Sequence, residues 1–236
     1  NILFDVGGDF DILSENALKL GVDLTSIDIV IISHGHGDHG GALGEFLSFN
    51  SKATVYVQRR AFLPHYSLRD SGMADISLDS ELTNHPNIIL LDGDYQIDQE
   101  LSLFTITDNS KCYSTANNSL YECDELDNFR HEQNLLINEN GNNTLIIGCG
   151  HNGVVNILDR AEEYMPQLCV GGFHLNARSA GGTVAETLLN DIANELHRYT
   201  ATTLYTCHCT GSEAYDYLKR EIPNLNYLHC GDTINN

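Results

Sequence analysis

Residues 29–41 read Ile-Val-Ile-Ile-Ser-His-Gly-His-Gly-Asp-His-Gly-Gly, a β-branched run followed at once by polar residues and glycines. The apolar part lacks polar alternation, which is typical of a strand buried inside a sheet. The potential metal ligands that follow it are His34, His36, Asp38 and His39. Imidazole nitrogen and carboxylate oxygen suit zinc, iron or manganese, and Gly35 and Gly37 let the backbone turn tightly enough for these side chains to converge. This spacing favours a metal site over a polar loop with accidental histidines.

Later histidines also follow predicted strands. His151 comes after the apolar segment 144–148, and His208 follows the segment 203–207. The repetition of a buried strand followed by histidine indicates two similar β-halves, each of which presents ligands at its strand ends. Amphipathic periodicity predicts helices at 11–20, 153–164, 183–198 and 212–220.

Composition limits the partners that the chain can have. Its 236 residues are 42% hydrophobic, enough for one domain with a sizeable core. With 12 Lys and Arg against 33 Asp and Glu, the formal charge is −21, so we expect no nucleic-acid partner. No apolar run approaches the length of a membrane helix, so we expect no membrane partner. Seven cysteines without the spacing of a disulfide framework favour reduced thiols and a cytoplasmic location.

The motifs together resemble the metallo-β-lactamase superfamily, a set of mostly two-metal hydrolases. Besides the four ligands above, the resemblance rests on Ile2-Leu3-Phe4-Asp5, Gly148-Cys149-Gly150-His151, Gly171-Gly172-Phe173-His174-Leu175 and His208-Cys209-Thr210-Gly211. These flanks are similar to a branch named after a dihydropterin ribofuranosyl-aminobenzene phosphate synthase of methanopterin metabolism. The resemblance runs from residue 2 to about residue 211. It implies an α/β fold, namely an αββα four-layer sandwich in which helices flank two mixed β-sheets.

The resemblance also implies how the chain is organised. We expect one domain over residues 1–236, with an insertion at about 59–133 that forms the wall of a substrate pocket. The polar stretch 112–130 is expected to be a long loop. Because the chain begins inside a predicted strand at 2–6, and relatives carry earlier strands, N-terminal strands are expected to be missing.

The resemblance implies two divalent metal ions, with zinc favoured and manganese or iron as alternatives. One ion would be held by His34, His36 and His151, and the other by Asp38, His39 and His208. Three protein ligands per ion leave positions open for water, as a catalytic site requires. Such ions generate a hydroxide nucleophile at neutral pH, and Asp38 would orient it or carry its proton as a catalytic residue.

The sequence departs from the wider superfamily after the strand at 168–171. Many members carry a bridging aspartate there, whereas this chain has Gly171-Gly172-Phe173-His174. Without that anionic bridge, the second metal is expected to bind more weakly, and partial occupancy of its site is left open. His174 either takes the vacant place as a catalytic residue, acting as ligand or proton donor, or is a structural histidine.

Two cysteines flank His208. If the strand continued through them, Cys207 and Cys209 would both point away from the His208 face, so we expect packed thiols rather than ligands. Cys149, two residues before His151, is left open as a residue that lines the pocket.

Five further residues have predicted roles around the metals. Asp5 is expected to orient the metal loop, with a plain turn carboxylate as the alternative. The residues expected to bind substrate are His131, Glu132, Arg59 and Lys111, and a solvated surface position is the alternative for each charged side chain.

The ligand residues favour a metal-dependent hydrolase. The resemblance implies the same class or a related lyase or synthase, and a small anionic substrate that is pterin-like or phosphorylated. A di-iron reductase is disfavoured because such relatives place glutamate at His36 and need a flavin domain. The charge disfavours a nucleic-acid phosphodiesterase. The alternative from another class is a catalytically silent metal-dependent sensor or binding module. A homodimer is left open as the oligomeric state.

Overall fold

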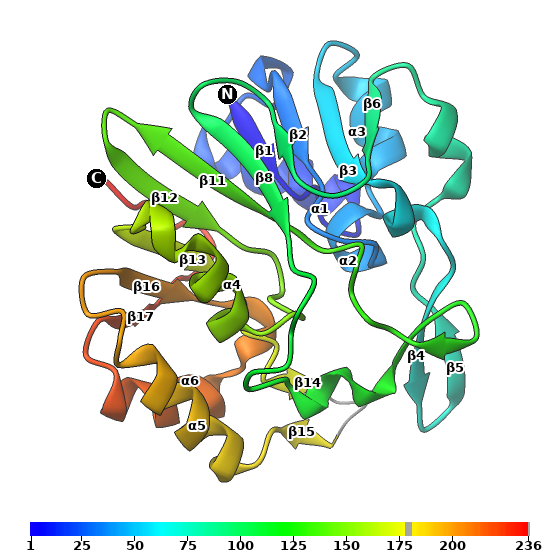
Figure 1. Ribbon diagram of the computed structural model, residues 1–236. Helices are drawn as coiled ribbons and strands as arrows, with labels where there is room; N and C mark the ends of the chain where they lie inside the picture. Colours follow the sequence, from blue (N-terminus) through cyan, green and yellow to red (C-terminus); the bar gives the residue numbers. More distant parts are fainter. Residues whose placement is uncertain (178–180, 236) are drawn as a thin grey trace. The chain divides into compact units, whose positions relative to one another are not determined.

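The computed structural model describes residues 1–177 and 181–235, which form two compact units (Figure 1). Unit 1 comprises Asn1–Asp94 and Leu120–Gln133. Unit 2 comprises Tyr95–Ser119 and Asn134–Asn236. The segment 59–133, expected as an insertion, is therefore divided between the two units. That the chain is a single domain stays a prediction.

The main sheet of unit 1 has four strands, and every described pairing in it is parallel. In sheet order these are β1 (Ile2–Phe4), β2 (Ile29–Ile31), β3 (Thr54–Gln58) and β6 (Ile88–Leu91). The helices α1 (Phe10–Leu20) and α3 (Leu43–Phe49) belong to the same unit. Phe46 of α3 and Ala17 of α1 are buried in one apolar cluster with Val30 and Val55 of the sheet. Burial on both sides explains the unbroken apolar run of β2.

Local capping fixes where α1 begins and ends. The Asp9 carboxylate accepts a hydrogen bond from the backbone N–H of Ile12 at 3.0 Å, which satisfies a donor of the first turn. Gly21 ends the helix with a left-handed φ of 71°, a conformation that glycine adopts without steric cost.

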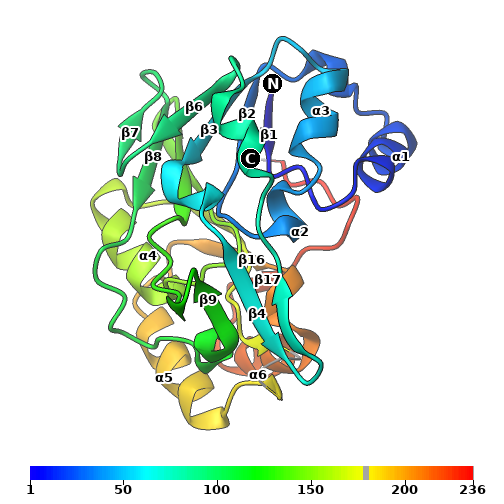
Figure 2. The same cartoon turned by 90° about the vertical axis from the view of Figure 1, so that its right-hand side faces the viewer.

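A second, antiparallel sheet in unit 1 corrects the expected loop at 112–130. Its strands, in sheet order, are β10 (Glu125–Leu126), β9 (Leu120–Glu122), β4 (His65–Arg69) and β5 (Gly72–Asp75). Figure 2 shows β4 and β5 side by side. The expectation of an irregular loop is wrong at Leu120–Glu122 and Glu125–Leu126, because β9 pairs with β10 and with β4, which lies more than fifty residues away in the chain. A short strand with a distant partner leaves little local signal.

The sheet of unit 2 has seven strands and mixed direction. In sheet order these are β17 (Leu225–Tyr227), β16 (Thr203–Thr206), β13 (Leu168–Gly171), β12 (Asn142–Ile146), β11 (Gln133–Glu139), β8 (Leu101–Thr105) and β7 (Tyr95–Gln96). β12, β13, β16 and β17 run parallel, so their carboxyl ends share one edge of the sheet. A separate pair, β14 (Asn176–Ala177) and β15 (Gly182–Thr183), is antiparallel.

Three helices supply the core of unit 2. They are α4 (Val154–Ala161), α5 (Glu186–Leu196) and α6 (Ser212–Glu221). Leu158, Leu189 and Leu218, one from each helix, are buried in one cluster with Leu145 and Leu204 of the sheet. The remaining helical turns are short: η1 (Leu24–Ser26), α2 (Gly37–Gly40), η2 (Arg59–Phe62), η3 (Ser80–Asn84), η4 (Thr115–Ser119), η5 (Glu162–Tyr164) and η7 (His208–Thr210).

These elements give the mixed α/β fold class that the sequence predicts. The buried strands expected at 28–32 and 144–148 lie in different sheets, as β2 and β12. Among the described residues, no helix has the length and apolar character needed to cross a membrane.

Candidate metal centre

The ligand loop of unit 1 leaves β2 and winds into the short helix α2. His34 and His36 lie with ring centroids 4.6 Å apart, and His34 and His39 lie 4.1 Å apart. Glycine is required at position 35 because the backbone there packs directly against His65 and Ala61. A Cβ atom there would lie 2.5 Å from Nε2 of His65 and 2.6 Å from the carbonyl oxygen of Ala61. The structure thus brings three predicted ligands together and gives a steric reason for the glycine between them.

Asp5, at the end of β1, organises the ligand loop. Its Oδ1 accepts from the backbone N–H of Ser33, and its Oδ2 accepts from the Ser33 hydroxyl and from Nδ1–H of His39, each at 2.7 Å. Since the Ser33 hydroxyl donates to Asp5, its oxygen accepts from Nδ1–H of His34 at 2.8 Å. We assign the proton of both imidazoles to Nδ1 on this network, which puts their lone pairs on Nε2.

Asp38, the fourth predicted ligand of the loop, lies in α2 and is largely exposed, with 62% of its side chain accessible. Its Oδ2 lies 3.7 Å from Nε2 of His39. The carboxylate is therefore near the imidazole that the sequence groups with it.

In unit 2, Asn117 orients His151 in the same way. Nδ1 of His151 lies 2.9 Å from Oδ1 of Asn117, and the amide of Asn117 donates to the carbonyl oxygen of His151 at 2.8 Å. Nδ1 of His151 therefore carries the proton and its lone pair lies on Nε2. Sequence reasoning missed Asn117 because an asparagine in a polar segment carries no pattern that marks it.

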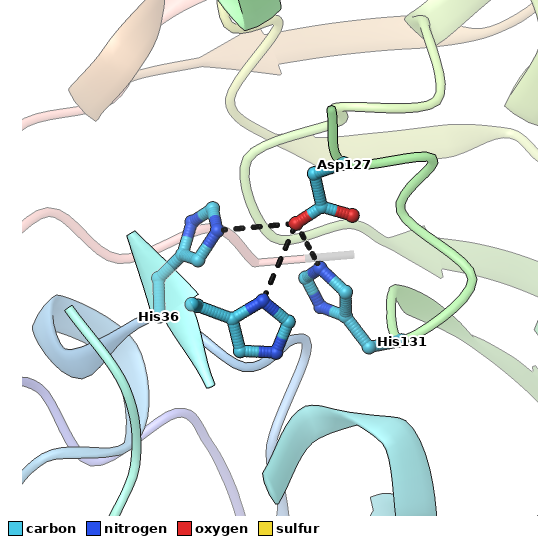
Figure 3. A group of neighbouring side chains, drawn as sticks. His36, Asp127 and His131 are labelled. Atoms are coloured by element: carbon cyan, nitrogen blue, oxygen red, sulfur yellow. Dashed lines mark hydrogen bonds and ion pairs between the residues drawn. The ribbon is translucent and has the colours of Figure 1, made fainter. Parts of the chain in front are cut away.

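A buried cluster around His36 was also missed (Figure 3). It consists of His36, His65, Asp127 and His131, whose nearest donor atoms all lie within 4.8 Å of one another. Oδ2 of Asp127 lies 2.9 Å from Nε2 of His131, 3.3 Å from Nδ1 of His65 and 3.9 Å from Nε2 of His36. The sequence marked His36 as a metal ligand and His131 as a substrate-binding residue, but it gave no sign that they gather around Asp127.

Hydrogen bonds fix the tautomers of two members of this cluster. Nδ1 of His131 accepts from the backbone N–H of Gly35 at 2.9 Å, so its proton lies on Nε2 and is donated to Asp127. Nε2 of His65 donates to the carbonyl oxygen of Arg60 at 3.2 Å, which turns Nδ1 toward Asp127. Because its Nε2 already carries a proton, His131 is better described as a support for Asp127 than as a metal ligand.

Burial sets the protonation states of this cluster. Burial lowers the pKa of His36 to about 4, although Asp127 acts in the opposite direction. Burial alone would raise the pKa of Asp127, but the hydrogen bond from His131 and the facing imidazoles of His36 and His65 hold it far below its usual range. At neutral pH, His36 is therefore a neutral imidazole, the form that binds metal, beside an ionised carboxylate.

A second cluster lies in unit 2 and contains the buried Cys149 and His174 and the half-buried Cys209, with one ligand atom of each again within 4.8 Å of the others. The prediction that Cys209 points away from the site was based on a strand through residue 207. β16 instead ends at Thr206, and η7 carries Cys209. Burial would raise the pKa of the Cys209 thiol, but the neighbouring Cys149 and His174 lower it well below its ordinary value. Strand alternation therefore does not apply to this cysteine.

The structure places the remaining predicted residues as follows. Arg59 pairs with Asp92 at 3.1 Å, and Lys111 pairs with Asp159. Glu132 is fully buried, and His208 is exposed at the start of η7. Their assignments to substrate or metal stay predictions.

Comparison with known proteins supports the expected family. A family model for the metallo-beta-lactamase superfamily matches residues 1–110. The uncharacterized protein MJ0448 of Methanocaldococcus jannaschii is 26% identical over 241 residues, covering 99% of this chain and 88% of its own. The 7,8-dihydropterin-6-methyl-4-(beta-D-ribofuranosyl)-aminobenzene-5'-phosphate synthase of the same organism is 24% identical over 253 residues, covering 99% and 83%.

Two solved structures show the same fold. Tm1679, described as a metal-dependent hydrolase of the beta-lactamase superfamily, aligns with a TM-score of 0.77 and 26% identity, covering 98% of this chain and 86% of its own. An isothiocyanate hydrolase from Delia radicum gut bacteria aligns with a TM-score of 0.58 and 14% identity, covering 91% and 79%. The resemblance to the metallo-β-lactamase superfamily is confirmed, and the chain has the metallo-β-lactamase fold.

Proposed function

We propose that this chain, with its metallo-β-lactamase fold and superfamily resemblance, is a metal-dependent hydrolase or a related lyase or synthase. Its substrate would be a small anionic molecule, pterin-like or phosphorylated. We assign two divalent metals, zinc first, to the six residues that the resemblance indicates: His34, His36, Asp38, His39, His151 and His208. The synthase from Methanocaldococcus jannaschii named above supports the substrate class.

The observation that carries the proposal is the set of oriented imidazoles. His34, His39 and His151 each have Nδ1 engaged by an oxygen, so Nε2 of each has the lone pair that a metal needs. Three histidines held in one tautomer by different partners, among them the half-buried carboxylate of Asp5, are expected of metal ligands. A structural core histidine has no need of such uniform orientation.

Asp127 supports the same interpretation at His36. The carboxylate faces Nε2 of His36 and accepts from Nε2–H of His131. His131 is itself fixed by the backbone N–H of Gly35, which donates to its Nδ1. A proton on Nε2 of His36 would leave the lone pair on Nδ1. We therefore infer that Asp127 is a positioning residue for His36, which would bind metal through Nδ1.

The chemistry of the donor set fits divalent metals that act as Lewis acids and supply a nucleophile at neutral pH. The chain itself contributes Asp38, whose exposed carboxylate can hold and pass the proton that hydrolysis moves. A silent metal-dependent sensor would need Asp38 only as a ligand and not as a proton carrier.

The proposal is tested by hydrolysis assays on phosphoesters, lactones and thioesters with protein of known metal content. We expect turnover by the metal-loaded wild type. Because Asp38 is also a proposed ligand, Asp38→Asn is compared after added metal has restored its metal content, and its turnover is then expected to be lower by on the order of 10²–10⁴. Metal binding without turnover on any of these classes would favour the sensor.

A further inference from the structure

We propose that Cys149, His174 and Cys209 of unit 2 form a thiolate–imidazole site for a soft divalent metal such as zinc. This site goes beyond the six ligands of the proposed function. It depends on unit 2 alone and requires no hydrolytic activity.

Sheet topology brings the three residues together. Cys149 follows β12, His174 follows β13, and Cys209 lies in η7 directly after β16. These three strands are parallel neighbours in one sheet, so the segments that follow them leave from the same edge. The sulfur atoms of Cys149 and Cys209 and a ring nitrogen of His174 all lie within 4.8 Å of one another.

The imidazole of His174 provides an independent indication of a ligand. It is 8% exposed, and neither Nδ1 nor Nε2 has a hydrogen-bond partner within residues 1–177 and 181–235. A buried imidazole without hydrogen bonds is costly, because both of its nitrogens have left water without compensation. A metal bound to one nitrogen would remove part of that cost.

The backbone is shaped to hold this arrangement. His174 has a φ of 44°, the left-handed region that non-glycine residues rarely adopt, and its carbonyl oxygen accepts from Ser114 Oγ at 2.5 Å. A Cβ atom on Gly172 would lie 2.6 Å from the sulfur of Cys209. Glycine at 172 therefore allows Cys209 to approach His174. Strained conformations of this kind concentrate at functional sites.

The donors fit zinc in number and kind. With zinc–sulfur bonds of about 2.3 Å and zinc–nitrogen bonds of about 2.0 Å, tetrahedral donors lie roughly 3.3–3.8 Å apart, so small side-chain movements suffice. Thiolates also select zinc over harder cations such as magnesium. Sulfur of Cys209 now donates to the carbonyl oxygen of Cys149 at 3.4 Å. Metal binding would move the thiol protons of Cys149 and Cys209 to solvent, leaving two thiolates.

Titration of the full-length, metal-stripped and reduced protein with Co²⁺ tests the site. Thiolate ligands give cobalt a charge-transfer absorption in the near ultraviolet that imidazole and carboxylate ligands lack. We expect this band in the wild type, its loss in Cys209→Ser and Cys149→Ser, and its retention in the control Cys207→Ser. Cys207 adjoins His208 in the chain but lies outside the cluster. Thermal unfolding of each variant checks that it is folded.

The outcomes separate this proposal from the proposed function. A charge-transfer band that depends on Cys149 and Cys209 supports the site even if no hydrolysis is found. Absence of the band in a cobalt-loaded, reduced wild type overturns the site, even if hydrolysis is found. A band unchanged in both serine variants also overturns it. So does a Cys149–Cys209 disulfide detected by mass spectrometry, if the protein binds no zinc once that disulfide has been reduced.

Discussion

At the scale of single residues, the orientation of imidazoles connects sequence with chemistry. Asp5 accepts three hydrogen bonds, two from Ser33 and one from His39, and acts on His34 through the Ser33 hydroxyl. Removing its charge would release the tautomers of two predicted ligands at once. Asp5 was expected to orient the metal loop, and these contacts show how it would do so.

We expect Asp5→Asn to weaken metal binding by on the order of 10–100-fold, because an amide cannot accept all three hydrogen bonds. Competition with a metallochromic chelator measures the affinity. Asp11→Asn, an exposed aspartate in the first turn of α1, is the matched control and should leave the affinity unchanged. Equal affinities in the two variants would show that Asp5 is only a turn carboxylate.

A second prediction at this scale concerns the effect of Asp127 on metal affinity. Asp127→Asn removes a buried charge that faces three histidines, so we expect metal affinity to fall by on the order of 10–100-fold. The control is Asp92→Asn, since Asp92 is exposed and pairs with the exposed Arg59. If Asp127→Asn lowered the unfolding free energy but bound metal like the wild type, the carboxylate would be a purely structural residue.

At the scale of elements, substitutions at two glycines test how closely the ligand loop packs against His65 and Ala61. Gly35→Ala would place a Cβ atom against His65 and Ala61, and we expect it to lower the unfolding free energy by about 1–3 kcal/mol. Gly44→Ala is the control. A Cβ atom on Gly44, in α3, would meet only Leu82 at 3.7 Å, so alanine should stabilise by about 0.5–1 kcal/mol. Chemical denaturation measures both, and equal effects would contradict the packing described.

The junction of α4 with the segment after α5 gives a pH-dependent prediction. Burial opposes ionisation of Asp159, but hydrogen bonds from Lys111, Tyr199 and Arg198 lower its pKa below the ordinary value. A lowered carboxyl pKa contributes stability above the unfolded pKa of about 3.9, and this contribution is lost as pH falls through the folded value.

We therefore expect Asp159→Asn to lower the unfolding free energy by about 1–2 kcal/mol at pH 7 and by less below about pH 4. Asp216→Asn, on an exposed position of α6, should have little effect at either pH. A difference between wild type and Asp159→Asn that stays constant from pH 7 to pH 3 would refute the assignment. Urea denaturation at each pH measures it.

Elements with local signals could be predicted from the sequence, and elements with distant partners could not. The apolar run of β2 and the periodicity of α5 lie within single segments, so both were predicted. β4 and β9 pair across more than fifty residues, and nothing in either segment specifies the other. The ligands of the loop after β2 could be predicted because they are adjacent in the chain. The roles of Asp127 and Asn117 could not be predicted, since they depend on tertiary contacts with His131 and His151.

At the scale of the whole molecule, the surface charge shapes what the protein can bind. A formal charge of −21 repels anionic substrates at long range, so an anionic substrate must be captured at short range by metals and a few local donors. Arg59 and Lys111 already pair with acidic side chains, which reduces what they offer to a ligand.

The metal content of the wild type and of the double variant His34→Ala/His39→Ala tests the central claim most directly. Elemental analysis of full-length protein prepared without chelator should find about two divalent transition-metal ions per chain in the wild type. The double variant should contain clearly less metal and show no turnover, with circular dichroism confirming that it is folded. Equal metal content and equal turnover in the two proteins would contradict the account.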